Sequence, residues 1–514
     1  MFNHKLFEKI IFGLFFIWLV AFIFFSFQNS QNYIFQEADD YLCPAAVKDF
    51  LTTGSYHWAG ARPGLIILAS LFGLNTPYKI SFMFVIFALL AVAGLFLLSR
   101  SVFKNLYLSF IPAVLWMTSE MFFYNSKTHL LIFVTFYFWG IWLCYEGLEN
   151  SKWWKYYLGC FLLGYSILTH YLIIFYLPII FLFFLFLFWQ KRYTLFSFIV
   201  KTFIPFLLPV FLIDSFAVGT YFLLGKKNWP FLYSVIGQHK VLMGCASNVD
   251  FFKIICVPHF IYRFEFLPLT ILIGISFIFF IFYIVKNFYL RKMKNSDLLL
   301  LVLFLPTISV SLRFCLGYLT ALRAFGATLP IVYVFVSFLF FKIFSRKYWS
   351  VLFLLTLILC FWRLYLNATN YSVKYITEWS EIAGNFEKSN FDVVIYLGTH
   401  NSLEQIINSK QIVSLNVESD ALLLLREGKR KEEFFALLTS KLNQGKKLAL
   451  VLWGDSKILN FVTNEFYKFF KVEELSKKKP FRYNSIDIID EGSIDWSTSP
   501  VIDYYVATYS LSKK

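Results

Sequence analysis

The sequence is poor in charged residues, and this excludes an ordinary soluble fold. Only 15% of its 514 residues are charged, whereas 59% are hydrophobic and the mean hydropathy is +0.64. Soluble domains carry about 25% charged residues, and a chain of this composition would precipitate from water. We therefore expect a lipid bilayer to be its main solvent.

Motifs that build metal centres or nucleotide sites are also lacking. None of the seven cysteines forms a Cys-x-x-Cys pair or a cluster with histidine, which disfavours a cysteine-built metal centre. Cys245 and Cys256 share one expected loop and could pair, although free thiols are the favoured interpretation. No glycine-rich phosphate loop opens a helix in the C-terminal part, which disfavours nucleotide binding.

The formal net charge of +16 does not indicate a nucleic-acid partner. A basic nucleic-acid binder keeps its Lys and Arg on one continuous face, whereas here they lie in short clusters between apolar runs. Such clusters are typical of the positive-inside rule. The charge therefore indicates membrane topology.

Eleven apolar runs approach or reach the roughly 20 residues that a membrane-spanning helix needs. They are Ile10–Phe27, Ile80–Leu98, Leu106–Met117, Leu130–Tyr145, Tyr156–Leu168, Leu172–Phe188, Phe198–Leu224, Leu267–Val285, Leu298–Leu316, Phe325–Ile343 and Trp349–Leu366. The first run is too long for a signal peptide and lacks a small-residue cleavage site, so we interpret it as an uncleaved anchor.

Basic residues fall on alternate connections between these runs. If the N-terminus is cytoplasmic, every short inner loop is basic, so this orientation is self-consistent. The basic residues of the inner side are Lys5, Lys9, Arg100, Lys104, Lys152, Lys155, Lys191, Arg192, Lys286, Arg291, Lys292, Lys294, Lys342, Arg346 and Lys347. An odd number of crossings then places 28–79, 225–266 and the chain after Asn367 outside.

The outer segments differ in character. The first suggests one or two amphipathic helices in the membrane interface, at AAVKDFLTTG and RPGLIILASLFGL. After Asn367, apolar strands such as DVVIYLG, QIVSLNV, KLALVLWG and VIDYYVATYSL alternate with amphipathic segments such as KEEFFALLTSKLNQG and SKILNFVTNEFYKFF. We expect a polytopic α-helical domain at 1–366 and a small extracytoplasmic α/β domain at 367–514, with a largely parallel sheet.

Three carboxylates follow the first apolar run, in EADDYLCPAAVKDFLTTG. Glu37, Asp39 and Asp40 are expected at the outer interface. Crowded carboxylates can raise one pKa to create a general base, or can hold a divalent cation. A solvated acidic turn that caps a helix is the structural alternative.

The stretch from Asp39 and Asp40 through Tyr41, Ala46, Leu51 and Gly54 to Arg62-Pro63 resembles the first outer loop of the GT-C superfamily of membrane glycosyltransferases. It is most similar to the arm with the lipid A aminoarabinose transferase and the protein O-mannosyltransferases. In that arm an Asp pair follows the first helix and a basic-Pro pair opens the next. GYSILTHY, LRAFGATLP and the terminal α/β domain fit the same layout.

The resemblance implies transfer of a sugar from a polyprenyl-phosphate donor to an acceptor lipid, glycan or protein, in a bacterial inner (plasma) membrane. The acceptor hydroxyl needs a base and the departing phosphate needs positive charge. Asp39 is the expected base and Asp40 its electrostatic neighbour. Arg62 and Arg323 are the expected phosphate ligands. No cofactor is certain, although Asp40 is a candidate ligand for a divalent metal, and the expected partners include membrane lipids but no nucleic acid.

The sequence departs from the family pattern at one position. Where relatives show a second acid in a Thr-Asp-apolar pattern, the stretch KTHLLIF offers His129, and Glu120 lies out of register. His129 could bind a metal or a phosphate, or could be a structural histidine at the interface. This departure disfavours the metal binding expected of relatives with two acids.

Further candidates surround the expected cavity. Arg323 lies in an outer loop, where the positive-inside rule does not predict a cation. It is either a phosphate ligand or a residue that snorkels to the interface. Arg313 approaches the outer face inside the ninth run and is a third expected ligand of the donor phosphate, although it could instead pair with Asp214. The remaining candidates for the substrate cavity are His170, Tyr171, Lys240 and Arg263, with helix-end packing or solvated charge as their structural alternatives.

Two other classes of function share the expected spans. One is a lipid-linked oligosaccharide transporter or polymerase, which would not need Asp39 and Asp40 beside a cavity. The other is a non-enzymatic membrane subunit whose outer domain recruits partners. Loss of sugar transfer on substitution of Asp39, with protein level unchanged, distinguishes the glycosyltransferase from both.

Overall fold

A computed structural model describes the chain in two compact units, of which the first contains Ala46–Lys374 and the second Tyr375–Lys514. The described residues are 13, 15–17, 19–20, 23, 47, 50–51, 54, 63–74, 77–119, 122, 129–170, 176–225, 265–315, 329–372, 390–398, 411–416, 429–478 and 504–514.

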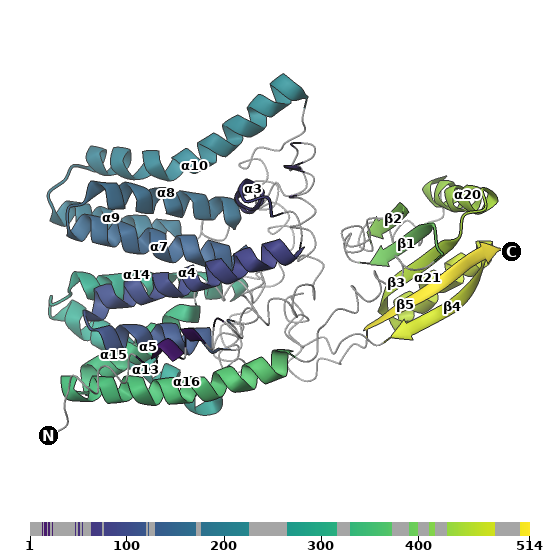
Figure 1. Cartoon of the computed structure of the whole chain (residues 1–514). Helices are drawn as coiled ribbons and strands as arrows, with labels where there is room; N and C mark the ends of the chain where they lie inside the picture. Colours follow the sequence, from purple (N-terminus) through teal and green to yellow (C-terminus); the bar gives the residue numbers. More distant parts are fainter. Residues whose placement is uncertain are drawn as a thin grey trace. The chain divides into compact units, whose positions relative to one another are not determined.

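The first unit is a helical bundle (Figure 1). Its helices are α3 (Pro63–Leu71), α4 (Pro77–Phe103), α5 (Leu106–Met117), α7 (His129–Glu149), α8 (Trp153–Thr169), α9 (Leu177–Gln190), α10 (Leu195–Leu224), α13 (Leu267–Tyr289), α14 (Asn295–Cys315), α15 (Val332–Ile343) and α16 (Trp349–Ser372). Short 3-10 turns, η5 (Leu329–Ile331) and η6 (Arg346–Tyr348), precede the last two.

Several of these helices can cross a membrane. Within the described residues, five are long and apolar enough by length and composition: Phe82–Phe103, Leu131–Glu149, Leu195–Leu224, Leu267–Tyr289 and Arg346–Tyr365. Shorter apolar helices such as Leu106–Met117 complete the bundle. The predicted helical membrane fold is confirmed, and each expected run after Ile10–Phe27 coincides with a helix, whereas most of that first run lies outside the described residues.

Several short connections of the bundle lie at one end, which we call the basic end (Figure 1). They join α4 to α5, α7 to α8, α9 to α10, α13 to α14 and α15 to α16. Lys104, Ser151, Arg192 and Arg291 adopt left-handed backbone here, with φ of 51° to 59°. Three of the four are cations, which are favourable beside the negative C-terminus of a helix.

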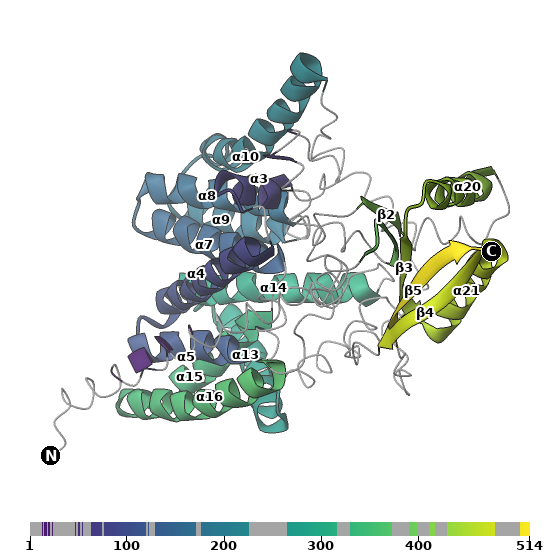
Figure 2. The same cartoon turned by 45° about the vertical axis from the view of Figure 1, so that its right-hand side comes forward.

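Glycines allow the helices around α8 to approach closely, and both views show α8 between α7 and α10 (Figures 1 and 2). A Cβ atom on Gly164 would lie 1.9 Å from the carbonyl oxygen of Phe206 in α10. A Cβ atom on Gly140 of α7 would lie 2.7 Å from Leu163. Small residues therefore set the spacing, as is common between helices in lipid.

Helix α3 forms where RPGLIILASLFGL predicts a helix. The prediction that this helix is amphipathic is wrong, because Pro63–Leu71 is apolar almost throughout and buries Leu65, Ile66 and Ala69. The Tyr165 hydroxyl of α8 donates a hydrogen bond to the Gly64 carbonyl oxygen at 2.7 Å. Packing on α8 therefore holds this helix to the bundle.

The second unit contains a five-stranded sheet in the order β2-β1-β3-β5-β4. Its strands are β1 (Val393–Gly398), β2 (Gln411–Asn416), β3 (Leu448–Asp455), β4 (Phe470–Lys478) and β5 (Tyr504–Lys513). Strand β1 runs parallel to β2 and β3, whereas β5 is antiparallel to both β3 and β4. The expectation of a largely parallel sheet is therefore wrong, because half of the pairings are antiparallel.

Two helices complete this unit, α20 (Lys429–Asn443) and α21 (Ser456–Phe469), where amphipathic segments predict them. Phe435 and Leu438 of α20 and Phe466 of α21 share one core with Leu450 and Tyr509 of the sheet. The helices therefore cover the same apolar surface of the sheet.

Candidate functional site

A buried ion pair connects several polar groups in the described part of the bundle. Arg363 of α16 and Glu265, one residue before the N-cap of α13, are 5% and 6% exposed. The Arg363 Nη2 donates to Glu265 Oε2. The Tyr333 hydroxyl of α15 donates to the second carboxylate oxygen of Glu265. Both oxygens of the carboxylate are therefore hydrogen-bonded.

The second nitrogen of the guanidinium turns toward α5. Arg363 Nη1 donates to the Leu115 carbonyl oxygen at 3.2 Å and reaches Thr118 Oγ1 at 3.5 Å. Thr118 is the C-cap of α5, so Leu115 carries one of the carbonyls that a helix end leaves without an intrahelical partner. The arginine thus neutralises both a carboxylate and the C-terminus of a helix.

Helix positions explain why these groups meet. Phe353, Leu357, Cys360 and Leu364 are buried at three- and four-residue spacing along α16, and Arg363 belongs to this buried side. By the 1.5 Å rise, Arg363 lies about 21 Å from the start of α16, toward the end opposite the basic end. Glu265 lies at the positive N-terminus of α13, where a carboxylate is favourable. The pair therefore joins one positive and one negative helix end.

Aromatic residues adjoin this cluster. Trp116 of α5 lies edge-on to Phe122 with ring centroids 5.1 Å apart, and contacts Phe138 of α7 at 6.0 Å. Within the described residues, Trp116 Nε1 and Tyr137 Oη are buried without a hydrogen-bond partner. A buried donor left unpaired costs about 1–3 kcal/mol, so either atom would be stabilised by a polar group of a ligand.

His170 is the candidate whose side chain the structure describes. It is the C-cap of α8, 6% exposed, and its backbone N–H donates to the Ser166 carbonyl oxygen at 3.0 Å. Its ring lies 5.8 Å from Phe133 of α7, which in turn contacts Tyr137 and Tyr176. The structure therefore brings His170 to the aromatic residues at the end opposite the basic end.

Comparison with known proteins identifies the architecture. No protein-family model matches the chain, and no curated protein matches it by sequence. Solved structures do match over nearly the whole length. The crystal structure of ArnT from Cupriavidus metallidurans bound to undecaprenyl phosphate superposes with a TM-score of 0.58 at 10% identity, covering 97% of this chain and 98% of ArnT.

The fold resembles that of ArnT. The apo state of the same ArnT gives a TM-score of 0.55 at 11% identity and covers 98% of both chains. ArnT is a lipid A aminoarabinose transferase of GT-C type. The fold expected from the resemblance of the first outer loop is therefore confirmed.

The other predicted site residues are only partly located. His129 is the first residue of α7, and Arg313 lies in the last turn of α14, both at the end opposite the basic end. The remaining candidates lie outside the described residues: Asp39, Asp40, Arg62, Tyr171, Lys240, Arg263 and Arg323. No group of three or more His, Cys, Asp or Glu that could hold a metal occurs among the described residues.

Sequence reasoning missed Arg363 and Glu265. The signal for Arg363 was present, because a charge inside an apolar run marks a functional or paired residue by default. The segment LILCFWRLYL carries it near the end of the last run. Glu265 had a weaker signal, since it comes directly before FLPLTILIG and has the position of an ordinary interfacial acid.

Proposed function

We propose that the protein is a glycosyltransferase of GT-C type that moves a sugar from a polyprenyl-phosphate donor to an acceptor on the extracytoplasmic side. One observation carries this proposal. The fold similarity to ArnT extends over both the helical unit and the C-terminal unit, and one ArnT structure holds undecaprenyl phosphate. Because two units agree, the likeness is more than that of a generic helical bundle.

The proposed orientation places the basic end in the cytoplasm. Each described connection at that end carries at least one Lys or Arg, which the positive-inside rule assigns to the cytoplasmic side. The C-terminus of α16 and the C-terminal unit are then extracytoplasmic. The acceptor would be met on that side of the membrane.

The proposed chemistry uses the residues of the first outer loop. Asp39 takes the proton from the acceptor hydroxyl, because attack on the anomeric carbon requires a stronger nucleophile than a neutral hydroxyl. Asp40 supports that carboxylate electrostatically or binds a divalent metal. Arg62, Arg313 and Arg323 neutralise the charge that develops on the departing lipid phosphate. His129, His170, Tyr171, Lys240 and Arg263 are the proposed lining of the cavity.

Arg363 has a different proposed role. Its guanidinium already bonds Glu265, Leu115 and Thr118. Because the Glu265 carboxylate compensates its positive charge, a phosphate would be attracted only weakly. The ion pair instead fixes the ends of α5, α13 and α16 relative to one another. A fixed framework is needed, because misplacement of a catalytic group by about 1 Å can cost 100-fold in rate.

Mass spectrometry of envelope lipids and glycans tests this proposal. Cells with and without the gene are compared, and a strain that expresses Asp39→Asn at the same level is the matched control. We expect a species that differs by one sugar mass to disappear in both the deletion and the Asp39→Asn strain. Identical profiles in all three strains would contradict the proposal.

A further inference from the structure

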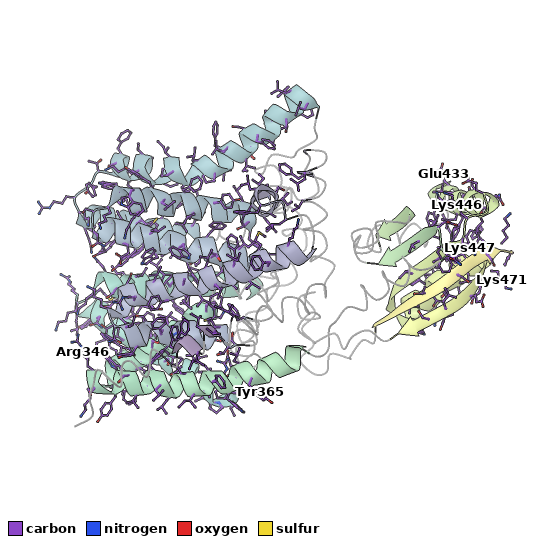
Figure 3. The ribbon with its side chains drawn as sticks, viewed as in Figure 1. Arg346, Tyr365, Glu433, Lys446, Lys447 and Lys471 are labelled. Atoms are coloured by element: carbon purple, nitrogen blue, oxygen red, sulfur yellow. The ribbon has the colours of Figure 1, made fainter. Side chains whose placement is uncertain are left out.

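The C-terminal unit carries a cluster of lysines at one end of the strands of its sheet. This end is where β1 and β3 begin, β5 ends and β4 begins. We call it the basic edge and define it by Lys446, Lys447, Lys468, Lys471, Lys513 and Lys514. Figure 3 labels Lys446, Lys447 and Lys471, which lie at the same end of this unit.

Strand register explains the cluster. Leu448 pairs with Leu511 and Lys471 pairs with Ser512, so Ser512 lies between the start of β3 and the start of β4. Adjacent strands are about 4.8 Å apart, which places Lys447 and Lys471 on the order of 10 Å from each other. Repulsion between neighbouring cations at that distance favours an anionic partner.

These cations have few carboxylates of their own. Among the described residues, Lys446, Lys447, Lys471 and Lys513 form no ion pair with a carboxylate, whereas Lys468 pairs with Glu465 at 2.6 Å. Asp392 lies at this edge and accepts a hydrogen bond from the Lys447 backbone N–H at 2.9 Å. Glu473 is the nearest acid on β4. The local balance is therefore strongly positive.

Exposed aromatic rings accompany the lysines. Tyr467 and Phe469, at the end of α21, are 47% and 46% exposed, and they flank Lys468. Half-exposed aromatic rings among cations are typical of surfaces that meet lipid headgroups, where the rings enter the interface and the cations meet phosphates. A soluble polyanion would be bound by the cations alone, and its binding would not require exposed aromatic rings.

The chain itself keeps this unit close to lipid. Helix α16 ends at Ser372, and residues 373–392 connect it to Val393, which begins β1 at the basic edge. A connection of this length spans at most about 70 Å when fully extended. The tether raises the effective concentration of headgroups around this unit, so that weak contacts from single lysines are sufficient for docking.

From these observations we propose that the basic edge is a docking surface for the anionic headgroups of the bilayer in which the protein is embedded. The lysines contact lipid phosphates, and Tyr467 and Phe469 contact the interface. The proposal goes beyond the proposed glycosyltransferase function and does not depend on it. No sugar transfer enters the test described next.

Acylation of individual lysines in the full-length protein tests this docking. The protein is placed in nanodiscs of neutral phosphatidylcholine, or of the same lipid with added phosphatidylglycerol, and treated with a neutral acylating reagent. Mass spectrometry then gives a rate for each lysine. Nanodiscs expose both membrane faces, so the result is independent of the proposed orientation.

We expect acylation of Lys447 and Lys471 to slow about fivefold in anionic discs, the factor that one lysine near such a surface contributes. High salt should restore the rate, since screening shortens the reach of the charges. Lys477, exposed near the other end of β4, should react equally in both discs. The combined change Lys471→Gln and Lys513→Gln should reduce the slowing at Lys447, whereas Lys477→Gln should leave it intact.

Several outcomes would overturn the proposal. Equal rates at Lys447 and Lys471 in neutral and anionic discs would show that no docking occurs. Slowing at Lys477 to the same extent would show a general effect of the anionic discs. Slowing by soluble polyphosphate but not by anionic lipid would assign the edge to a soluble polyanion instead.

Discussion

Replacement of Arg363 by methionine isolates the contribution of the buried ion pair to the stability of the bundle. The change keeps much of the side-chain volume but removes the guanidinium. Glu265, which is 6% exposed, then retains its charge with the Tyr333 hydroxyl as a remaining donor. The Leu115 carbonyl oxygen at the end of α5 also loses its hydrogen bond from Arg363.

The expected loss follows from the burial of both partners. Removing one member of a buried pair leaves an uncompensated charge and costs about 3–5 kcal/mol. In a large domain this corresponds to a lowering of Tm on the order of 5–10 °C. The double variant Arg363→Met with Glu265→Leu should recover most of the loss, because no buried charge remains. Recovery should be incomplete by about 1–2 kcal/mol, because the Tyr333 hydroxyl and the Leu115 carbonyl oxygen each lose one hydrogen bond.

Thermal unfolding of the purified protein in detergent, followed by fluorescence, measures these differences. Phe361→Ala is a matched control on the same helix, because Phe361 is 53% exposed and faces away from the pair. A wild-type Tm for Arg363→Met would refute the reasoning. A double variant no more stable than the single one would show that the loss comes from packing rather than from the buried carboxylate that has lost its arginine.

Three further predictions concern packing, the donor phosphate and topology. Gly164→Ala should destabilise the bundle, because its Cβ atom would lie 1.9 Å from the Phe206 carbonyl oxygen, whereas Gly274→Ala meets nothing within 4 Å; equal thermal stability of the two would contradict the close approach of α8 and α10. Arg323→Ala should lower both catalytic rate and donor affinity, with partial rescue by lysine, because a lysine lacks the planar fork that grips two phosphate oxygens. Wild-type activity of Arg323→Ala would place the phosphate elsewhere. Protease added to intact spheroplasts should remove the C-terminal unit, and digestion only after permeabilisation would reverse the proposed orientation.

The helical part of the fold could be predicted because lipid imposes a simple rule. A spanning helix must be continuously apolar, so Leu106–Met117 is both the predicted run and the observed helix α5. Prolines lie near the described starts of two helices. Within the run Leu172–Phe188, α9 begins at Leu177 with Pro178 in its first turn, and within Phe325–Ile343 the described residues form η5 and α15 around Pro330.

The sheet was harder to predict because strand direction has no hydropathy signature. The run VIDYYVATYSL predicts a strand, but only pairing with β3 and β4 shows that it runs antiparallel. Strand β4 was missed altogether. Its sequence FKVEELSKK is mostly charged, and only Phe470 and Val472 are buried in its described part, as suits an edge strand.

The candidate site shows a similar division. The position of His170 at the end of α8 follows from the length of an apolar run, so its neighbourhood could be predicted. The pairing of Arg363 with Glu265 joins residues 98 positions apart, which no local pattern contains. Their meeting depends on how α5, α13 and α16 pack, and the roles of Asp39, Asp40, Arg62 and Arg323 stay predictions.

Release of polyprenyl phosphate from a polyprenyl-phosphate sugar tests the central claim most directly. The measurement compares purified wild-type protein with Asp39→Asn, at equal protein concentration and with envelope lipids and glycans as acceptors. The account predicts acceptor-dependent release by the wild type and a rate lower by roughly 100-fold or more for Asp39→Asn, the scale of a positioned general base. Release by Asp39→Asn at the wild-type rate would contradict the account.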